Sequence, residues 1–159
     1  MLQRLILLLS LWTFACSPRP AAPSTSATSS KDTELASAVT QARGSLDEFV
    51  TRIAAPHANR TFVAVKVRFA PPGESPQDIW VDEVTYINGV FRGTMGDDIP
   101  SLRLEAGEKV TIKEEDIVDW MLVEDGKLVG GYTIRLALQR MSPEEREQFL
   151  ETLDYTIED

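Results

Sequence analysis

The chain has 159 residues, of which 43% are hydrophobic, and its formal net charge at pH 7 is −9. Because an acidic surface repels the phosphate backbone, we expect no nucleic acid partner. One Cys and one His cannot supply the usual ligand sets of a zinc site, and no P-loop or dinucleotide fingerprint occurs. The sequence therefore predicts no metal and no cofactor.

The first sixteen residues have the order of an export signal. Arg4 precedes an apolar run that is too short to span a bilayer, and Cys16 follows this run directly. The pair Ala15-Cys16 resembles the lipobox of bacterial lipoproteins; cleavage by an ordinary signal peptidase after "TFA" is the alternative. We expect a lipid on Cys16. Because Ser17 rather than Asp follows, we expect anchoring in the outer membrane, facing the periplasm.

Two further segments follow the signal. Residues 17–30, "SPRPAAPSTSATSS", lack the apolar residues that a packed face needs, so we expect a solvated tether. Residues 31–159 have the length of a single domain with one core. Since the only Cys lies in the signal, this domain must be stable without an internal disulfide.

The domain begins with a helical pattern. Apolar residues recur at helical spacing through residues 35–53, and Gly44 interrupts them. Ser45 and Glu48 fit a capping box, and Pro56 ends the pattern. We therefore expect one helix on each side of Gly44.

A strand and a hairpin are predicted next. Residues 61–69 alternate with the period of a strand, with the Val residues and Phe69 on one face. After a "PPGESP" loop, Asn88-Gly89 fits the type I′ turn of a hairpin, in a register that pairs Asp82 with Met95. One face then carries five candidate core residues: Trp80, Val84, Tyr86, Phe91 and Met95.

A second hairpin carries the densest motif of the chain. Residues 109–112 predict a short strand, and residues 114–120 a single helical turn or an irregular corner. Asp125-Gly126 is another type I′ signal, which sets Gly130-Gly131 opposite Met121 and Trp120. We expect the two glycines to leave room for these large side chains.

The C-terminal region is predicted to be helical. Residues 132–141 fit a helix better than a strand, and Ser142, Pro143 and Glu145 form a strong helix start. The last helix is expected to bury Phe149, Leu150 and Leu153. Since strands come in runs, we predict an α+β domain with N-terminal helices, an antiparallel sheet of about six strands built from hairpins, and a C-terminal helix.

Few side chains offer chemistry. His57 lies in a polar loop, where a lone His is usually solvated. Asp97, Asp98, Asp116 and Asp119 could pair for general acid–base work, but Asp97-Asp98 lacks the regular oxygen spacing of a calcium loop. The main expectation for these carboxylates is an acidic, solvated surface, so we assign no catalytic residue.

Four residues of the second hairpin region are candidates for binding. Trp, Tyr and Arg are the usual anchors of protein interfaces, and they gather here with a Met: the candidates are Trp120, Met121, Tyr132 and Arg135. The alternative is structural, with a core Trp packed on glycine, a Tyr at a helix start and a partly exposed Arg.

The same region carries a resemblance. The pattern "I-x-DWM…DGK-x-x-GGYT-x-R" runs from Ile117 to Arg135, and "IWVDEVTYINGVFRGTM" and a leading "ARGSLDEF" precede it. These segments resemble the YegJ-like family, uncharacterised bacterial proteins built on a domain of unknown function, over most of residues 35–141. Family members often carry Pro where this chain has Lys113. The resemblance implies the domain and brings no activity, substrate or cofactor.

Together these patterns predict a non-enzymatic interaction module in the cell envelope. It would be attached to the membrane through Cys16 and hold an envelope protein as its partner. Two alternatives remain: a carboxylate-based hydrolase acting on envelope carbohydrate, and an inhibitor or immunity-type protein whose acidic face blocks a basic enzyme.

Overall fold

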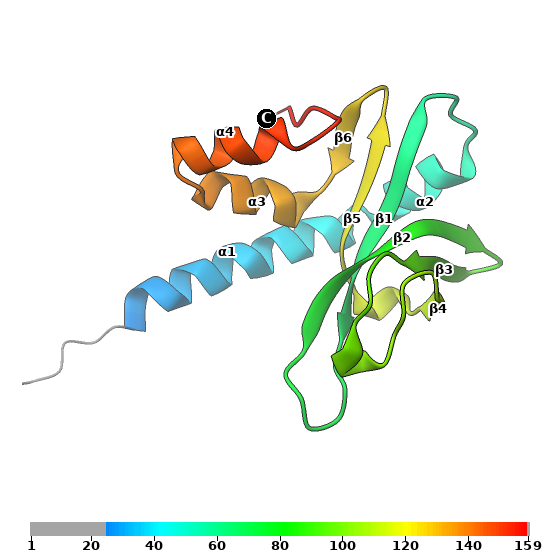
Figure 1. Cartoon of the computed structure of the whole chain (residues 1–159), viewed down its shortest axis with the longest axis horizontal. Coiled ribbons are helices and arrows are strands. Elements are labelled where there is room, and N and C mark those ends of the chain that lie inside the picture. Colours follow the sequence, from blue (N-terminus) through cyan, green and yellow to red (C-terminus); the bar gives the residue numbers. More distant parts are fainter. Residues whose placement is uncertain (1–24, 159) are drawn as a thin grey trace, which may run out of the picture.

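An antiparallel sheet of six strands forms the centre of the molecule (Figure 1). The computed structural model describes residues 25–158, so the predicted export signal, Cys16 and the beginning of the predicted tether lie outside the described residues. The strand order is β4-β3-β2-β1-β5-β6. The strands are β1 (Arg60–Phe69), β2 (Gln77–Ile87), β3 (Val90–Met95), β4 (Lys109–Ile112), β5 (Ile117–Glu124) and β6 (Lys127–Gly130).

Helices precede and follow this sheet along the chain, which confirms the α+β prediction. The helices are α1 (Thr25–Gly44), α2 (Leu46–Ala54), α3 (Tyr132–Arg140) and α4 (Pro143–Glu151), and η1 (Pro100–Leu102) and η2 (Glu114–Asp116) are short 3₁₀ turns. Figure 1 shows α3 and α4 beside the β6 edge, above α1, whose first turns extend away from the sheet. No helix within residues 25–158 is both long and apolar enough to cross a membrane.

The N-terminal helices break at Gly44, as predicted, but the predicted capping box is wrong. Ser45 makes no side-chain cap to α2. Its hydroxyl instead donates to the Gln41 carbonyl (3.0 Å) and accepts from the Trp120 indole N–H (3.0 Å). Glu48 pairs with Arg52 one turn later. Ser45 thus joins α1 to the sheet; α1 itself begins at Thr25, inside the segment ascribed to the tether.

The main core lies between the sheet and the two N-terminal helices. Its centre is aromatic, with ring centroids 5.3 Å apart for Phe49 and Trp120 and 6.2 Å apart for Phe49 and Phe91. Each such pair contributes about 1 kcal/mol beyond the burial of its area. The alternating face predicted for β1 packs here: Val63, Val65, Val67 and Phe69.

The first hairpin follows the prediction only near its turn. Asn88 and Gly89 have φ of 53° and 81°, as a type I′ turn requires. Beyond Thr85 a bulge at Glu83, whose φ is 51°, shifts the register by one residue, so Asp82 pairs with Thr94. The predicted pairing of Asp82 with Met95 is therefore wrong. Val81 takes the core position predicted for Trp80, and Trp80 lies on the opposite face of the sheet.

The second hairpin has the predicted register from Glu124–Lys127 to Met121–Gly130. The expected corner before it is only the three residues of η2, because β5 already begins at Ile117. A smaller core covers the other face of the sheet here, and the C-terminal tail completes it through Tyr155 and Ile157. Its buried members are Ala64, Met121, Val123 and Leu128.

The C-terminal helices form where predicted, and Ser142 and Glu145 make the complete capping box of α4. The buried stripe predicted for this helix is wrong. Phe149, Leu150 and Leu153 are each only partly buried, and Leu153 lies beyond the end of α4. α4 therefore presents apolar side chains that the described chain does not fully cover.

Candidate functional site

The motif from Ile117 to Arg135 is organised around the carboxylate of Asp119, which is fully buried. Its Oδ1 accepts hydrogen bonds from the backbone N–H groups of Trp120 (2.8 Å) and Tyr132 (3.1 Å). Its Oδ2 accepts from the backbone N–H (2.7 Å) and the hydroxyl (2.6 Å) of Thr133. The carboxylate thereby caps the first turn of α3, where a negative charge also suits the helix dipole.

Lys66 extends this network across the sheet. Its Nζ donates to the Thr133 hydroxyl (3.0 Å) and lies 5.0 Å from the centroid of the Trp80 ring. Burial lowers the pKa of Lys66, and the negative charges of Asp119 and Asp78 oppose that shift. Sequence reasoning missed this role of Lys66, because the contact depends on the pairing of β1 with β5.

Trp120 and Met121, two of the candidate binding residues, lie in the interior. Trp120 is 1% exposed, and its indole N–H also donates to the Ala42 carbonyl (3.0 Å). Met121 belongs to the smaller core. A Cβ added at Gly130 would lie 2.5 Å from the Trp120 carbonyl oxygen, so Gly130 makes room for Trp120, whereas Gly131 faces Leu128 rather than Met121. The structural alternative describes these two side chains.

Tyr132 and Arg135 are partly exposed. The Arg135 guanidinium donates to the carbonyls of Gly130 (3.0 Å), Leu128 (3.2 Å) and Glu158, so it holds β6 and the C-terminal tail together. Both side chains also line a cavity of about 300 Å³ between α1 and α3. The structure therefore brings these two candidates to a surface cavity and leaves the other two buried.

The four aspartates proposed for acid–base work lie in two groups, which strands of the sheet separate. Asp97 and Asp98 are exposed after β3, Asp116 lies in η2, and Asp119 caps α3. Strands β2 and β1 separate β3 from β5, a distance of roughly 14 Å at the usual strand spacing. This exceeds the roughly 5–9.5 Å between the carboxylates of glycoside hydrolases. Among residues 25–158, no three His, Cys, Asp or Glu side chains gather to hold a metal ion.

Two other carboxylates, which sequence reasoning did not select, have distinctive surroundings. Burial raises the pKa of Asp82, and the negative charges of Asp97 and Glu83 raise it further. Glu124 is buried and pairs with Arg60 (2.7 Å) and Arg52 (2.9 Å). Glu124 joins α2 to the sheet and therefore has a structural role. The surroundings of Asp82 disfavour the charged form of its carboxyl group, as the raised pKa indicates.

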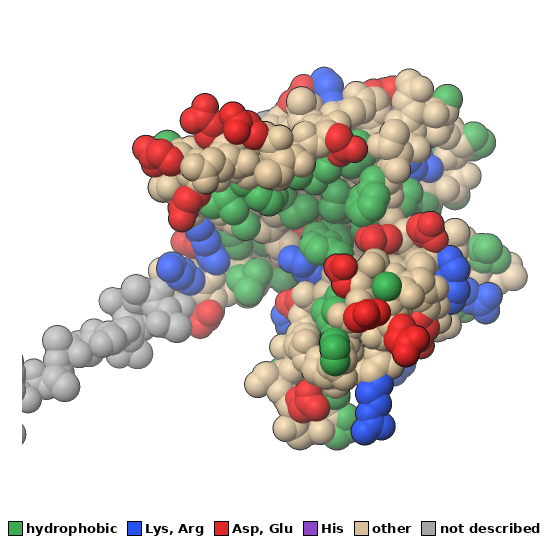
Figure 2. All heavy atoms as spheres, viewed as in Figure 1, with side chains coloured by type: hydrophobic (Ala, Val, Ile, Leu, Met, Phe, Trp, Pro, Cys, Tyr) green, Lys and Arg blue, Asp and Glu red, His purple; other side chains and the backbone are tan. Residues whose placement is uncertain are grey.

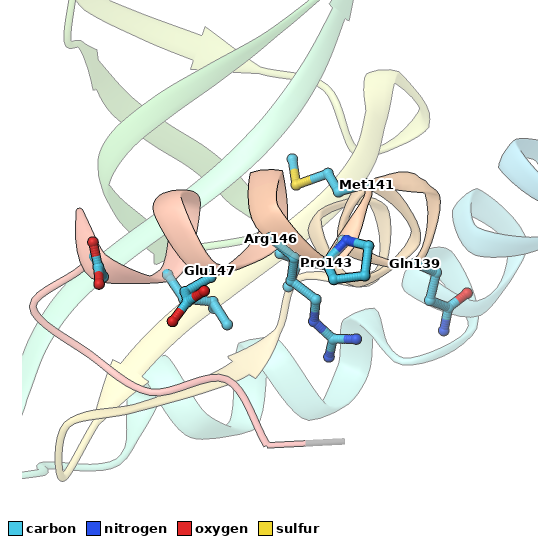
Figure 3. A pocket seen from close by; sticks show the side chains of 8 residues that line it. Gln139, Met141, Pro143, Arg146 and Glu147 are labelled. Carbon is cyan, nitrogen blue, oxygen red and sulfur yellow. The ribbon is translucent and has the colours of Figure 1, made fainter.

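An open groove of about 630 Å³ lies between α3 and α4 (Figure 3). Three apolar side chains form its floor. Leu138 is buried, and Met141 and Leu150 are partly exposed. Figure 2 shows a band of hydrophobic side chains below α4 and acidic side chains along the outside of this helix. The lining residues are Leu138, Gln139, Met141, Pro143, Arg146, Glu147, Leu150 and Glu151.

Comparison with known proteins identifies relatives of this chain. The model of a family described as an uncharacterized protein conserved in bacteria (DUF2314) matches residues 32–155. The uncharacterized protein YegJ of Escherichia coli K12 is 33% identical over 150 residues, which cover 92% of this chain and 95% of that protein. A Neisseria meningitidis serogroup B protein, whose name ascribes ankyrin repeats to it, is 35% identical over 94 residues, which are 55% of this chain and 36% of that protein. No solved structure matches.

Proposed function

The chain belongs to the DUF2314 family of bacterial proteins, and we propose that it is a non-enzymatic binding module of the cell envelope. A lipid on Cys16 would hold it at the outer membrane, facing the periplasm, where it binds an envelope protein. The observation that carries the binding role is the groove between α3 and α4 (Figure 3), in which the apolar side chains of Met141 and Leu150 are partly exposed. Concave surfaces that combine apolar side chains with a few polar groups are the usual places where ligands bind.

The sequence before the domain supports the proposed location. Arg4, the apolar run and Cys16 stand in the order of a lipoprotein signal. The net charge of −9 gives the chain little attraction for anionic lipid, so attachment to the membrane would come from the acyl chains on Cys16.

An inhibitor or immunity-type protein is the second candidate. The acidic side chains on the outside of α4 favour it, because they complement the basic surface of an enzyme (Figure 2). The two candidates differ in their effect on the partner: an inhibitor abolishes the activity of the enzyme that it captures, whereas a simple tethering module does not. The hydrolase alternative has less support, because both oxygens of Asp119 serve the start of α3.

Affinity capture tests the binding role. The chain without its first sixteen residues is immobilised, and a solubilised envelope extract of the source bacterium is passed over it. In a groove variant, Met141→Ala and Leu150→Ala remove apolar contacts from the floor without changing the charge. The matched control is Ile87→Ala with Val90→Ala, which removes exposed apolar side chains from the tip of the first hairpin.

We expect one envelope protein to be retained by the parent and by the hairpin control and to be lost by the groove variant. Circular dichroism must show that all three proteins keep the same fold. If the parent retains nothing, the proposed binding module is contradicted. Equal retention by all three proteins would contradict the assignment of the groove as the binding face.

A further inference from the structure

The described chain leaves the apolar side of α4 incompletely covered. No residue of α4 is buried, although Phe149 and Leu150 are large and apolar. A helix in a protein gains most of its stability by packing an apolar stripe against a partner surface. Leu138, at the floor of the groove, is only 3% exposed, whereas Met141 is partly exposed to solvent. The groove therefore has an apolar floor on which a further apolar element fits.

The rim of this groove carries more acidic than basic side chains, and Arg146 is the basic residue in its lining. Glu147 and Glu151 line it and stand one helical turn apart, and Glu144 precedes Glu147 by three residues, so the three carboxylates follow one side of α4. All three are exposed. From Met141 to Glu158 the chain has six acidic residues and one basic residue, Arg146. Such a rim repels an acidic partner and attracts Lys and Arg side chains.

An apolar floor between charged edges is the geometry by which grooves recognise amphipathic helices. Because the edge here is negative, we propose that the α3–α4 groove binds a basic amphipathic helix of the partner protein. The apolar residues of this helix, at helical spacing, would pack on Met141 and Leu150, and its flanking Lys or Arg residues would face Glu147 and Glu151. This inference rests on the proposed binding function and adds the chemistry of the partner.

A synthetic helix provides the probe for this proposal. It is a fluorescent peptide of about fourteen residues, long enough to form an amphipathic helix, with Leu at helical spacing and Lys elsewhere. The full chain is held in nanodiscs of phosphatidylcholine, and binding is followed by fluorescence anisotropy. We expect saturable binding that weakens as salt is added, because salt screens exposed charges.

Two charge variants locate the binding face. Glu147→Lys with Glu151→Lys reverses the rim of the groove, and we expect the affinity to fall about tenfold, as for two lost surface ion pairs. Glu74→Lys with Glu105→Lys makes the same change in net charge at exposed positions elsewhere. For this control we expect the affinity to change less than about twofold.

Three results would overturn the proposal: equal weakening in both charge variants, equal binding of a scrambled Leu/Lys peptide, and equal binding of a peptide with Glu in place of Lys. Each would mean that the groove does not select a basic amphipathic helix. The capture experiment keeps the two proposals apart. If an envelope protein is lost by the groove variant but the Lys peptide does not bind, only the partner chemistry is wrong. If the Lys peptide binds as expected but no envelope protein is captured, the proposed function fails.

Discussion

A carboxylate whose two oxygens each accept two hydrogen bonds is poorly suited to acid–base chemistry, and Asp119 is such a group. Proton transfer would break the start of α3, since the acceptors of the Tyr132 and Thr133 N–H groups would change. The sequence showed a carboxylate beside a Trp and left its role open. The structure resolves that role through Thr133, fourteen residues later in the chain.

Replacing Asp119 by Asn tests this role. In Asn an NH₂ group, which is a donor, replaces one of the two carboxylate oxygens. The two N–H or O–H groups that donate to that oxygen would then lose their acceptor. We expect Asp119→Asn to lower the free energy of unfolding by about 2–3 kcal/mol, measured by urea unfolding with circular dichroism. Asp116→Asn, in η2, is the control and should change it by less than about 0.5 kcal/mol. Equal effects would contradict the capping role.

Asp82 gives a prediction that depends on pH. Since burial and nearby negative charges raise its pKa above the ordinary value of 3.8, the folded state holds the proton more tightly than the unfolded state. Stability therefore falls as the pH rises through the window between 3.8 and the raised pKa. Above that window the charged side chain is destabilising.

Asp82→Asn should therefore stabilise the protein by about 0.5 kcal/mol at neutral pH, a small value because solvent screens a partly exposed group. This gain should vanish as the pH falls below 3.8, the ordinary pKa of an Asp side chain, because the parent side chain is then protonated in both the folded and the unfolded state. Urea midpoints of the parent and the variant at several pH values provide the measurement. A gain that does not depend on pH would show that the charge of Asp82 is not its cause.

At the scale of elements, short-range signals predicted most of the fold. The Asn88-Gly89 and Asp125-Gly126 turns fixed two hairpin registers, and the box at Ser142 fixed the start of α4, because each depends on neighbours in the chain. The bulge at Glu83 was not predictable, since Glu rarely adopts positive φ. That one residue moved Trp80 to the other face of the sheet.

The candidate site was harder to predict because its residues depend on tertiary contacts. A Trp and an Arg close together resemble an interface, yet Trp120 is held by a carbonyl of α1, and Arg135 by carbonyls of β6 and the tail. The groove between α3 and α4 was hidden for the same reason. Phe149 and Leu150 have the pattern of a buried stripe, and only the packing of the two helices shows how little of it is covered.

Gly130 tests the packing of the second hairpin against the main core. In Gly130→Ala the added methyl group would meet the Trp120 carbonyl and ring, at a residue whose φ is 75°. We expect the free energy of unfolding to fall by about 3 kcal/mol, from overpacking and backbone strain together.

Gly126 provides the matched control for this prediction. Its φ is 71°, but nothing lies within 4 Å of an added Cβ. Gly126→Ala should therefore cost only the backbone strain, about 1 kcal/mol. Thermal unfolding of both variants gives the comparison, and similar losses would mean that contact with Trp120 is not what requires glycine at position 130.

At the scale of the whole molecule, the proposed binding face and the proposed anchor lie at different places along the chain. The twenty residues of α1 span about 30 Å, and Figure 1 shows its first turns extending away from the sheet. The chain enters the described part at Thr25, at that end of α1. An anchor on Cys16 would therefore act on the N-terminal end of α1, which Arg140 of α3 contacts through the Lys31 carbonyl (2.7 Å) and the Glu34 carboxylate (2.9 Å).

The anchor itself gives the last prediction. Each buried CH₂ of an acyl chain contributes about 0.8 kcal/mol, so one chain holds a protein marginally and two or more hold it stably. We expect the parent protein to stay in the membrane fraction through a high-salt wash and to incorporate labelled palmitate. Cys16→Ser should lose the label. Ser17→Asp should keep the label but move the protein to the inner-membrane fraction of a density gradient. Cleavage before Cys16 without added acyl mass, measured by mass spectrometry, would instead indicate an ordinary signal peptidase and a module without a lipid anchor.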